Sequence, residues 1–179
     1  KNMWDAFFAE IYAPLQQNGI IIMPVPGSQD SSMKHPKLLS DAYDSVWQSH
    51  QPNIDVDGNY PYTYSYDYKN SHFAVLGTAN YIITDEQLQW LENDLSSTKQ
   101  GNIFVFSHTP LEPFCSEAIC GSLQENKQEL AQVMNKYNVD IFFSGNNHVY
   151  YRASYNGVNV VSTGALGGTF NIISNDEKQ

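Results

Sequence analysis

Apolar runs of strand length alternate with amphipathic helical stripes along this chain, and this alternation is what most limits its possible folds. The runs that predict strands cover residues 20–25, 72–76, 102–107, 139–144, 149–155 and 158–163. The stripes that predict helices cover residues 3–17, 38–48, 85–97 and 123–137, the third opening with a capping box at Thr84 and Gln87. Because Asn156-Gly157 is typical of a two-residue hairpin, the last two strands are expected to be antiparallel. The pattern predicts an α/β fold with a mixed sheet.

The composition limits the size of the core and the classes of partner. At 179 residues and 41% hydrophobic, the chain is long enough to bury one sizeable core. Nine lysines and arginines stand against nineteen aspartates and glutamates, a net charge of −10, so neither a nucleic acid nor an anionic membrane surface is an expected partner. The longest apolar run, residues 20–25, is far shorter than the roughly 20 residues that span a bilayer. No membrane span is expected.

Tyrosine occupies every even position from Tyr60 to Tyr68. In an extended strand a period of two places all five rings on one face. Such a face either packs on the core or forms an aromatic platform for a sugar or a peptide. Both interpretations remain open from the sequence.

Three apolar runs end in polar or imidazole side chains, a form that is more specific than any single histidine. They are Met23-Pro24-Val25-Pro26-Gly27-Ser28-Gln29-Asp30, Phe104-Val105-Phe106-Ser107-His108-Thr109-Pro110 and Phe142-Phe143-Ser144-Gly145-Asn146-Asn147-His148. Side chains at successive strand ends converge on one edge of an α/β sheet, where such folds bind ligands and metals. This edge is the expected position of a functional site.

In their order and spacing, these blocks resemble the calcineurin-like metallophosphoesterases, and more narrowly their purple acid phosphatase-like branch. Intervening segments extend the resemblance over nearly the whole chain, including residues 64–67, 72–78 and 86–95, His148-Val149-Tyr150-Tyr151-Arg152 and the glycine-rich stretch 162–168. The resemblance implies an αββα sandwich of two mixed β-sheets flanked by helices. It also implies that residues 1–173 are the C-terminal portion of a single such domain, followed by a polar tail at 174–179.

The family holds two metal ions that clamp a phosphate and activate a water molecule. Its D-x-H and G-D-x-x-D motifs do not occur in this sequence, so the resemblance implies that the N-terminal strands carrying them are missing and would lie upstream of Lys1. The resemblance assigns His108 to a ligand of the second metal and His148 to a ligand of the first. Where the family has Asn and His before Asp30, this chain has Ser28, a degraded ligand position, and Gln29, the position of the catalytic histidine.

The last block is altered as well, because Asn146 stands where the family has a second-metal histidine. Ser28, Gln29 and Asn146 therefore all fall at the second metal and the phosphate. Losing even an outer partner of a metal ligand typically costs about 10–100-fold in affinity or activity. Gln29 also cannot donate a proton as a histidine does near neutral pH.

Two functions follow from this resemblance. The first is a phosphoesterase-type hydrolase of small phosphate esters with an impaired second-metal site, binding one transition metal (iron, zinc or manganese) or none. The alternative is a catalytically inactive pseudophosphatase that serves as a binding or structural module. A separate chain or the missing N-terminal segment would complete the fold, and we expect residues 1–179 alone to associate through an uncovered apolar sheet face.

Three further residues have narrower interpretations. Arg152 either faces a phosphate or lies in solvent at a strand end. Cys115 and Cys120, separated by four residues in the loop after His108, either form a disulfide or remain two thiols. A disulfide would indicate a secreted, periplasmic or other oxidising location.

Overall fold

The computed structural model describes residues 3–30, 36–78, 80–113, 120–165 and 168–169. Its strands form one seven-stranded sheet in the order β1-β2-β3-β4-β5-β7-β6. The strands are β1 (Asp57–Asn59), β2 (Thr63–Tyr68), β3 (Ser71–Leu76), β4 (Asn102–Ser107), β5 (Ile141–Ser144), β6 (Tyr150–Tyr155) and β7 (Val158–Thr163). The helices are α1 (Met3–Phe7), the π-helix η1 (Phe8–Tyr12), α2 (Ala13–Gln17), α3 (Pro36–Gln48), α4 (Asp85–Ser97) and α5 (Lys127–Lys136).

The sheet is mixed, as predicted. Strands β3, β4, β5 and β7 are parallel, whereas β1 and β2 on one side and β6 on the other pair antiparallel with their neighbours. The hairpin between β6 and β7 turns at Asn156-Gly157 with φ angles of 47° and 89°. The carboxyl ends of the four parallel strands therefore lie at one edge of the sheet, which we call the carboxyl edge.

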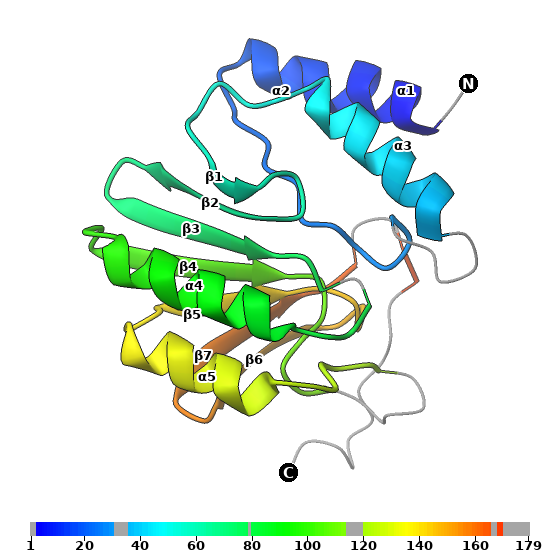
Figure 1. Cartoon of the computed structure of the whole chain (residues 1–179). Coiled ribbons are helices and arrows are strands. Elements are labelled where there is room, and N and C mark those ends of the chain that lie inside the picture. The colour runs from blue at the N-terminus through cyan, green and yellow to red at the C-terminus, as the bar shows by residue number, and fades with distance from the viewer. Residues whose placement is uncertain (1–2, 31–35, 79, 114–119, 166–167, 170–179) are drawn as a thin grey trace.

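Helices α4 and α5 lie side by side over the first face of the sheet (Figure 1). Their apolar stripes bury the larger core against alternate residues of β3, β4, β5 and β7. The predicted capping box begins α4, because the Thr84 hydroxyl accepts a hydrogen bond from the Gln87 N–H and the Gln87 side chain accepts one from the Thr84 N–H. The local capping signal and the packing of the apolar stripe on the sheet therefore both favour a helix at this position.

The second face packs on the N-terminal helices. Tyr12 and Trp47 come from these helices and meet Tyr60, Tyr64 and Val75 in a separate aromatic core. On β2 the even-numbered tyrosines share a face, as the period predicts, with Tyr64 fully buried and Tyr68 46% exposed. The core-packing interpretation holds for Tyr60 and Tyr64.

The predicted strand over residues 20–25 was wrong, because this segment forms no strand and does not join the sheet that the structure describes. Pro24 lies inside the run and Pro26 directly after it, and neither has an N–H to donate to a sheet. The run also leaves Ile20 and Ile21 exposed at 49% and 39%.

The fourth helix begins later than predicted, at Lys127 instead of residue 123. The backbone N–H of Leu123 donates to the Pro110 carbonyl and that of Gln124 to the Tyr81 carbonyl. Asn126 then takes a left-handed conformation with φ of 58°. These loop contacts hold residues 123–126 out of the helix.

The α/β class with a mixed sheet between helices is confirmed, but the described residues form one sheet where the expected sandwich has two. Helices α1 to α3 and the 20–25 segment occupy part of the second face. The tail at 174–179 lies outside the described residues. Among the helices that the structure describes, none is long and apolar enough to span a bilayer.

Candidate site at the carboxyl edge

The carboxyl edge holds a small cavity of about 180 Å³. Strands β4, β5 and β7 end here, and the cavity is lined by Val25, Phe106, Ser107, His108, Phe143, Ser144, Gly145 and Thr163. The predicted convergence of strand ends is therefore observed for the blocks that contain His108 and Gly145. Val25 adds the first block to the same cavity.

His108 contributes the imidazole among the residues that line this cavity. Its Nε2 atom is buried and has no hydrogen-bond partner. Burial lowers the pKa of His108, and the neighbouring His148 lowers it further, whereas nearby Asn146 opposes the shift without completing a hydrogen bond to Nε2. A buried imidazole that is neutral and unpartnered is the form that binds a metal ion.

A buried hydroxyl network fixes the backbone on either side of His108. The hydroxyls of Thr78 and Ser107 contact each other, and the Thr109 N–H donates to both. The Thr109 hydroxyl then donates to the Thr78 carbonyl at 2.6 Å. Since Thr78 follows β3 and Ser107 ends β4, this network ties the ends of two strands together beneath His108.

The turn Gly27–Asp30 faces His108 from the first block. The Asp30 carboxylate Oδ2 accepts the Gly27 N–H at 2.8 Å. Burial raises the pKa of Asp30, and the bond from Gly27 opposes that shift. Ser28 is half-buried and Gln29 is exposed in this turn.

Asn146 is held by groups of the protein itself. Its side-chain oxygen accepts a hydrogen bond from the Tyr81 hydroxyl at 3.2 Å, and its amide nitrogen approaches the Gly121 carbonyl at 3.5 Å. Asn146 also has a left-handed backbone with φ of 68°. The amide thus connects two loops, a structural task that a ligand to metal would not perform.

His148 and Arg152 do not join the cavity. His148 is exposed with φ of 55°, and its Nδ1 contacts the Thr169 carbonyl at 2.6 Å. Arg152 is exposed on β6, opposite Val161 and inside the strand. Cys120 is buried, but Cys115 lies outside the described residues, so their disulfide stays a prediction.

A dinuclear centre needs more ligands than this arrangement offers. The described residues contain no group of three His, Cys, Asp or Glu side chains that could hold a metal ion. The Nε2 atom of His108, which has no hydrogen-bond partner, could serve as one ligand to a metal. No other described imidazole lines the same cavity. The described donor set therefore fits a fragment of a metal site.

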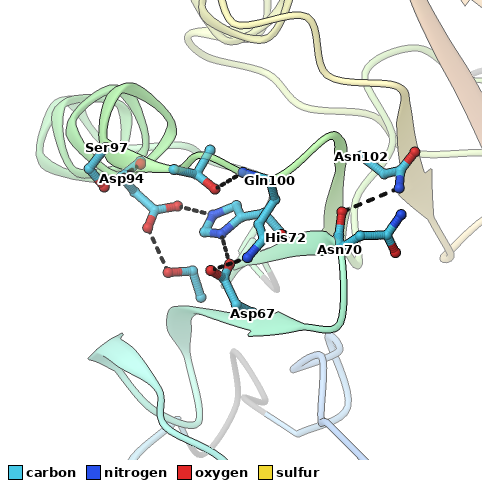
Figure 2. A network of polar contacts seen from close by, with 9 residues as sticks. Asp67, Asn70, His72, Asp94, Ser97, Gln100 and Asn102 are labelled. Atoms are coloured by element: carbon cyan, nitrogen blue, oxygen red, sulfur yellow. Dashed lines mark hydrogen bonds and ion pairs between the residues drawn. The ribbon is translucent and has the colours of Figure 1, made fainter.

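A second polar cluster lies at the opposite edge of the sheet, and the motifs in the sequence did not reveal it. Figure 2 shows His72, near the start of β3, between Asp67 of β2 and Asp94 of α4. His72 Nδ1 contacts Asp67 Oδ1 at 2.7 Å and Nε2 contacts Asp94 Oδ2 at 2.8 Å, while the Ser65 hydroxyl donates to Asp94 Oδ1. Burial alone would lower the pKa of His72, but both carboxylates together outweigh it and raise the pKa. This cluster joins β2, β3 and α4.

Known proteins share this arrangement of strands and helices. Purple acid phosphatase 23 of Arabidopsis thaliana is 30% identical to the chain over 105 residues, which are 56% of this chain and 23% of that protein. The purple acid phosphatase PPD1 from yellow lupin seeds matches with a TM-score of 0.54 and 24% identity over 66% of this chain and 26% of that one. The chain is thus similar in part of its sequence to a purple acid phosphatase and shares its fold with purple acid and dimetal phosphatases.

The metallophosphoesterase fold extends over most of the chain. A dimetal phosphatase from Danio rerio matches 89% of this chain and 65% of its own, with a TM-score of 0.55 and 19% identity. The chain spans only about a quarter of the length of the two purple acid phosphatases, with coverage of 23% and 26%. No protein-family profile matches the chain.

Proposed function

We propose that this chain is the C-terminal portion of a phosphoesterase-type hydrolase of small phosphate esters, with an impaired second-metal site. The observation that carries the proposal is the buried Nε2 of His108, which has no partner and lines a cavity at the carboxyl edge. A buried polar atom without a partner is costly unless a ligand or metal satisfies it. The relationship to purple acid phosphatases supports a metal as that ligand.

A metal in such a site would supply Lewis-acid activation of a phosphate ester and of a water molecule. In this chain His108 would hold the metal through Nε2, and the hydroxyl network of Thr78, Ser107 and Thr109 would keep the ring in place. His148 lies outside the cavity, and the contact of its Nδ1 with the Thr169 carbonyl leaves Nε2 as the ring atom that would bind a metal. Iron, zinc and manganese all suit imidazole and carboxylate ligands.

The impairment of the second site follows from three side chains. Ser28 and Asn146 stand at degraded ligand positions, and the oxygen of Asn146 already accepts the Tyr81 hydroxyl. Gln29, at the position of the family's catalytic histidine, is exposed and does not titrate. Proton donation to a leaving group therefore has no donor at this position.

A pseudophosphatase is the second candidate function. The absence of any three-ligand group among the described side chains favours it. In that case the fold would serve as a binding or structural module, and the His108 cavity would be an evolutionary remnant. Fold alone does not decide between these functions.

The partners and location belong to the same proposal. A small phosphate ester is the substrate, and an N-terminal segment or a separate chain completes the sandwich. If Cys115 and Cys120 are paired, the chain functions in a secreted, periplasmic or other oxidising compartment.

The test is hydrolysis of p-nitrophenyl phosphate with added Mn²⁺, Zn²⁺ or Fe³⁺, using the full-length protein that contains these residues. The wild type should be slow, and His108→Ala should lower kcat/KM by at least about tenfold. The control His50→Ala changes an imidazole that stacks on Phe8, away from this edge. A restored variant with Ser28→Asn, Gln29→His and Asn146→His should gain activity. Activity that is unaffected by His108→Ala, or absent in wild type and restored variant alike, would contradict the proposal.

A further inference from the structure

A cavity of about 520 Å³ that is lined by three aromatic side chains opens beside the candidate site. Its aromatic side chains are Tyr43 of α3, Tyr62 before β2 and Trp90 of α4. Pro26 and Asp30 also line it, so it borders the turn that faces His108. A concave site with several aromatic rings is of the size and type that binds small molecules.

Hydrogen bonds and close packing fix the walls of this cavity. The Gln87 side-chain amide donates to the Thr63 hydroxyl at 2.9 Å and to the Gly77 carbonyl at 3.1 Å. The Trp90 ring lies 3.0 Å from the position that a Cβ on Gly58 would occupy. Gly58 has φ of 94°, so the close approach of Trp90 depends on glycine there. A preformed wall lowers the entropic cost of binding.

The charge around the cavity is of one sign. Asp30 and Glu86 line it, and the carboxylates of Asp44 and Asp41 act on the Tyr62 hydroxyl, whose pKa is raised first by burial and then by these charges. Among the described lining residues there is no lysine, arginine or histidine. The whole chain carries a net charge of −10, which adds to the negative potential.

We propose that this cavity binds a small organic cation, an amine or a quaternary ammonium group, between the rings of Tyr62 and Trp90 and the carboxylate of Asp30. Aromatic faces attract cations through their quadrupole, and the attraction grows when the cation is desolvated. A carboxylate beside the rings supplies the counter-charge. The combination selects a cation over a neutral molecule of the same shape.

The state of Asp30 agrees with this assignment. Its half-buried carboxylate lines the cavity, and the described group that donates to it is the uncharged Gly27 N–H. A bound cation would provide the positive charge that the described surroundings lack. The inference needs no metal and no hydrolysis, so it goes beyond the proposed function and can fail separately.

The direct test is titration of the protein with choline, followed by saturation-transfer NMR and calorimetry in metal-free buffer. The matched neutral probe is 3,3-dimethylbutan-1-ol, in which a carbon atom replaces the charged nitrogen. We expect saturable binding of choline that is at least about tenfold tighter than that of the alcohol. Equal binding of both probes, or no saturable binding of choline, would overturn the proposal.

Variants locate the site. Asp30→Asn keeps the shape of the side chain and its acceptor for Gly27, and should weaken choline binding by about fivefold or more without changing binding of the alcohol. Tyr62→Leu should weaken it as well. The control Asp55→Asn makes the same change of charge outside the cavity. If Asp30→Asn and Asp55→Asn weaken choline binding equally, the effect arises from the overall charge of the chain. That result would contradict a defined binding site.

Discussion

Asp30 and His108 face each other across Gly27: the carboxylate Oδ2 and the imidazole Nδ1 each lie 3.3 Å from the position that a Cβ on Gly27 would occupy. Glycine at this position lets the first block approach the strand-end imidazole. Gly27 thus lies between the candidate metal ligand and the carboxylate that lines the neighbouring cavity.

Replacing Gly27 should therefore disturb both sites. In Gly27→Ala the added methyl group must displace Asp30 or His108 by a few tenths of an ångström, an overpacking that costs about 1 kcal/mol. We expect weaker choline binding together with weaker metal binding, measured by calorimetry. Gly101→Ala is the control, since nothing lies within 4 Å of a Cβ there. Equal behaviour of the two variants would show that the packing around Gly27 is not tight.

The contact between His72 and its two carboxylates should make stability depend on pH. The folded-state pKa of His72 is raised, so its stabilisation is complete below the unfolded value of about 6.5 and is lost as pH rises through the folded pKa. The pKa of Asp67 is lowered through its bonds to Gln100 and His72, which exceed the opposing effect of burial. Its contribution is therefore lost on acidification. Urea unfolding should give a maximum in mildly acid solution.

His72→Gln should remove the decline of the free energy of unfolding above about pH 6.5. Below that pH it should lower the free energy of unfolding by about 3 kcal/mol, because Asp94 is left buried beside a neutral group. His50→Gln is the matched control, because the His50 ring contacts the Val46 carbonyl instead of a carboxylate. If both variants keep the wild-type slope above that pH, His72 is not the responsible group.

The hydroxyl network beneath His108 should be sensitive to the loss of one donor. Thr109→Val preserves side-chain shape but removes the 2.6 Å bond to the Thr78 carbonyl, which still accepts the Tyr81 N–H, so the expected cost is about 0.5–1.5 kcal/mol. The control Thr98→Val, at the end of α4, should change stability by less than about 0.5 kcal/mol. Thermal unfolding compares the two, and an unchanged Tm for Thr109→Val would contradict the role of the network.

An aromatic ladder on the second face should cause association of residues 1–179. Ring centroids of Tyr66 and Phe73 lie 5.0 Å apart, those of Phe73 and Phe104 5.5 Å, and those of Phe106 and Phe143 5.0 Å. Phe104 and Phe143 are only half-buried. Sedimentation velocity should show self-association that Phe104→Glu reduces and Met3→Glu does not. A monomer at all concentrations would contradict this expectation.

The elements that could be predicted from sequence are those whose signals are local. The capping box at Thr84, the hairpin at Asn156-Gly157 and the runs 102–107 and 158–163 each specify their element through neighbouring residues. The run at 20–25 has the apolar composition of a strand, yet Pro24 and Pro26 lack the N–H groups that pairing requires.

The site was predictable to the level of blocks but not of contacts. Strand-end spacing pointed to His108 and the carboxyl edge, and His108 lines a cavity at that edge. It did not show that Tyr81 engages Asn146, or that Asp67 and Asp94 flank His72, because these contacts join residues 65, 5 and 22 positions apart. Such pairings depend on tertiary packing that periodicity does not encode.

The central claim is that His108 belongs to an impaired metal site, and metal content tests it most directly. The full-length protein is loaded with Mn²⁺, Zn²⁺ or Fe³⁺, freed of excess ions and analysed for metal per chain. We predict fewer than two ions for the wild type, a further decrease for His108→Ala, and an increase for the variant with Ser28→Asn and Asn146→His. Two tightly held ions in the wild type, unchanged by His108→Ala, would contradict the account.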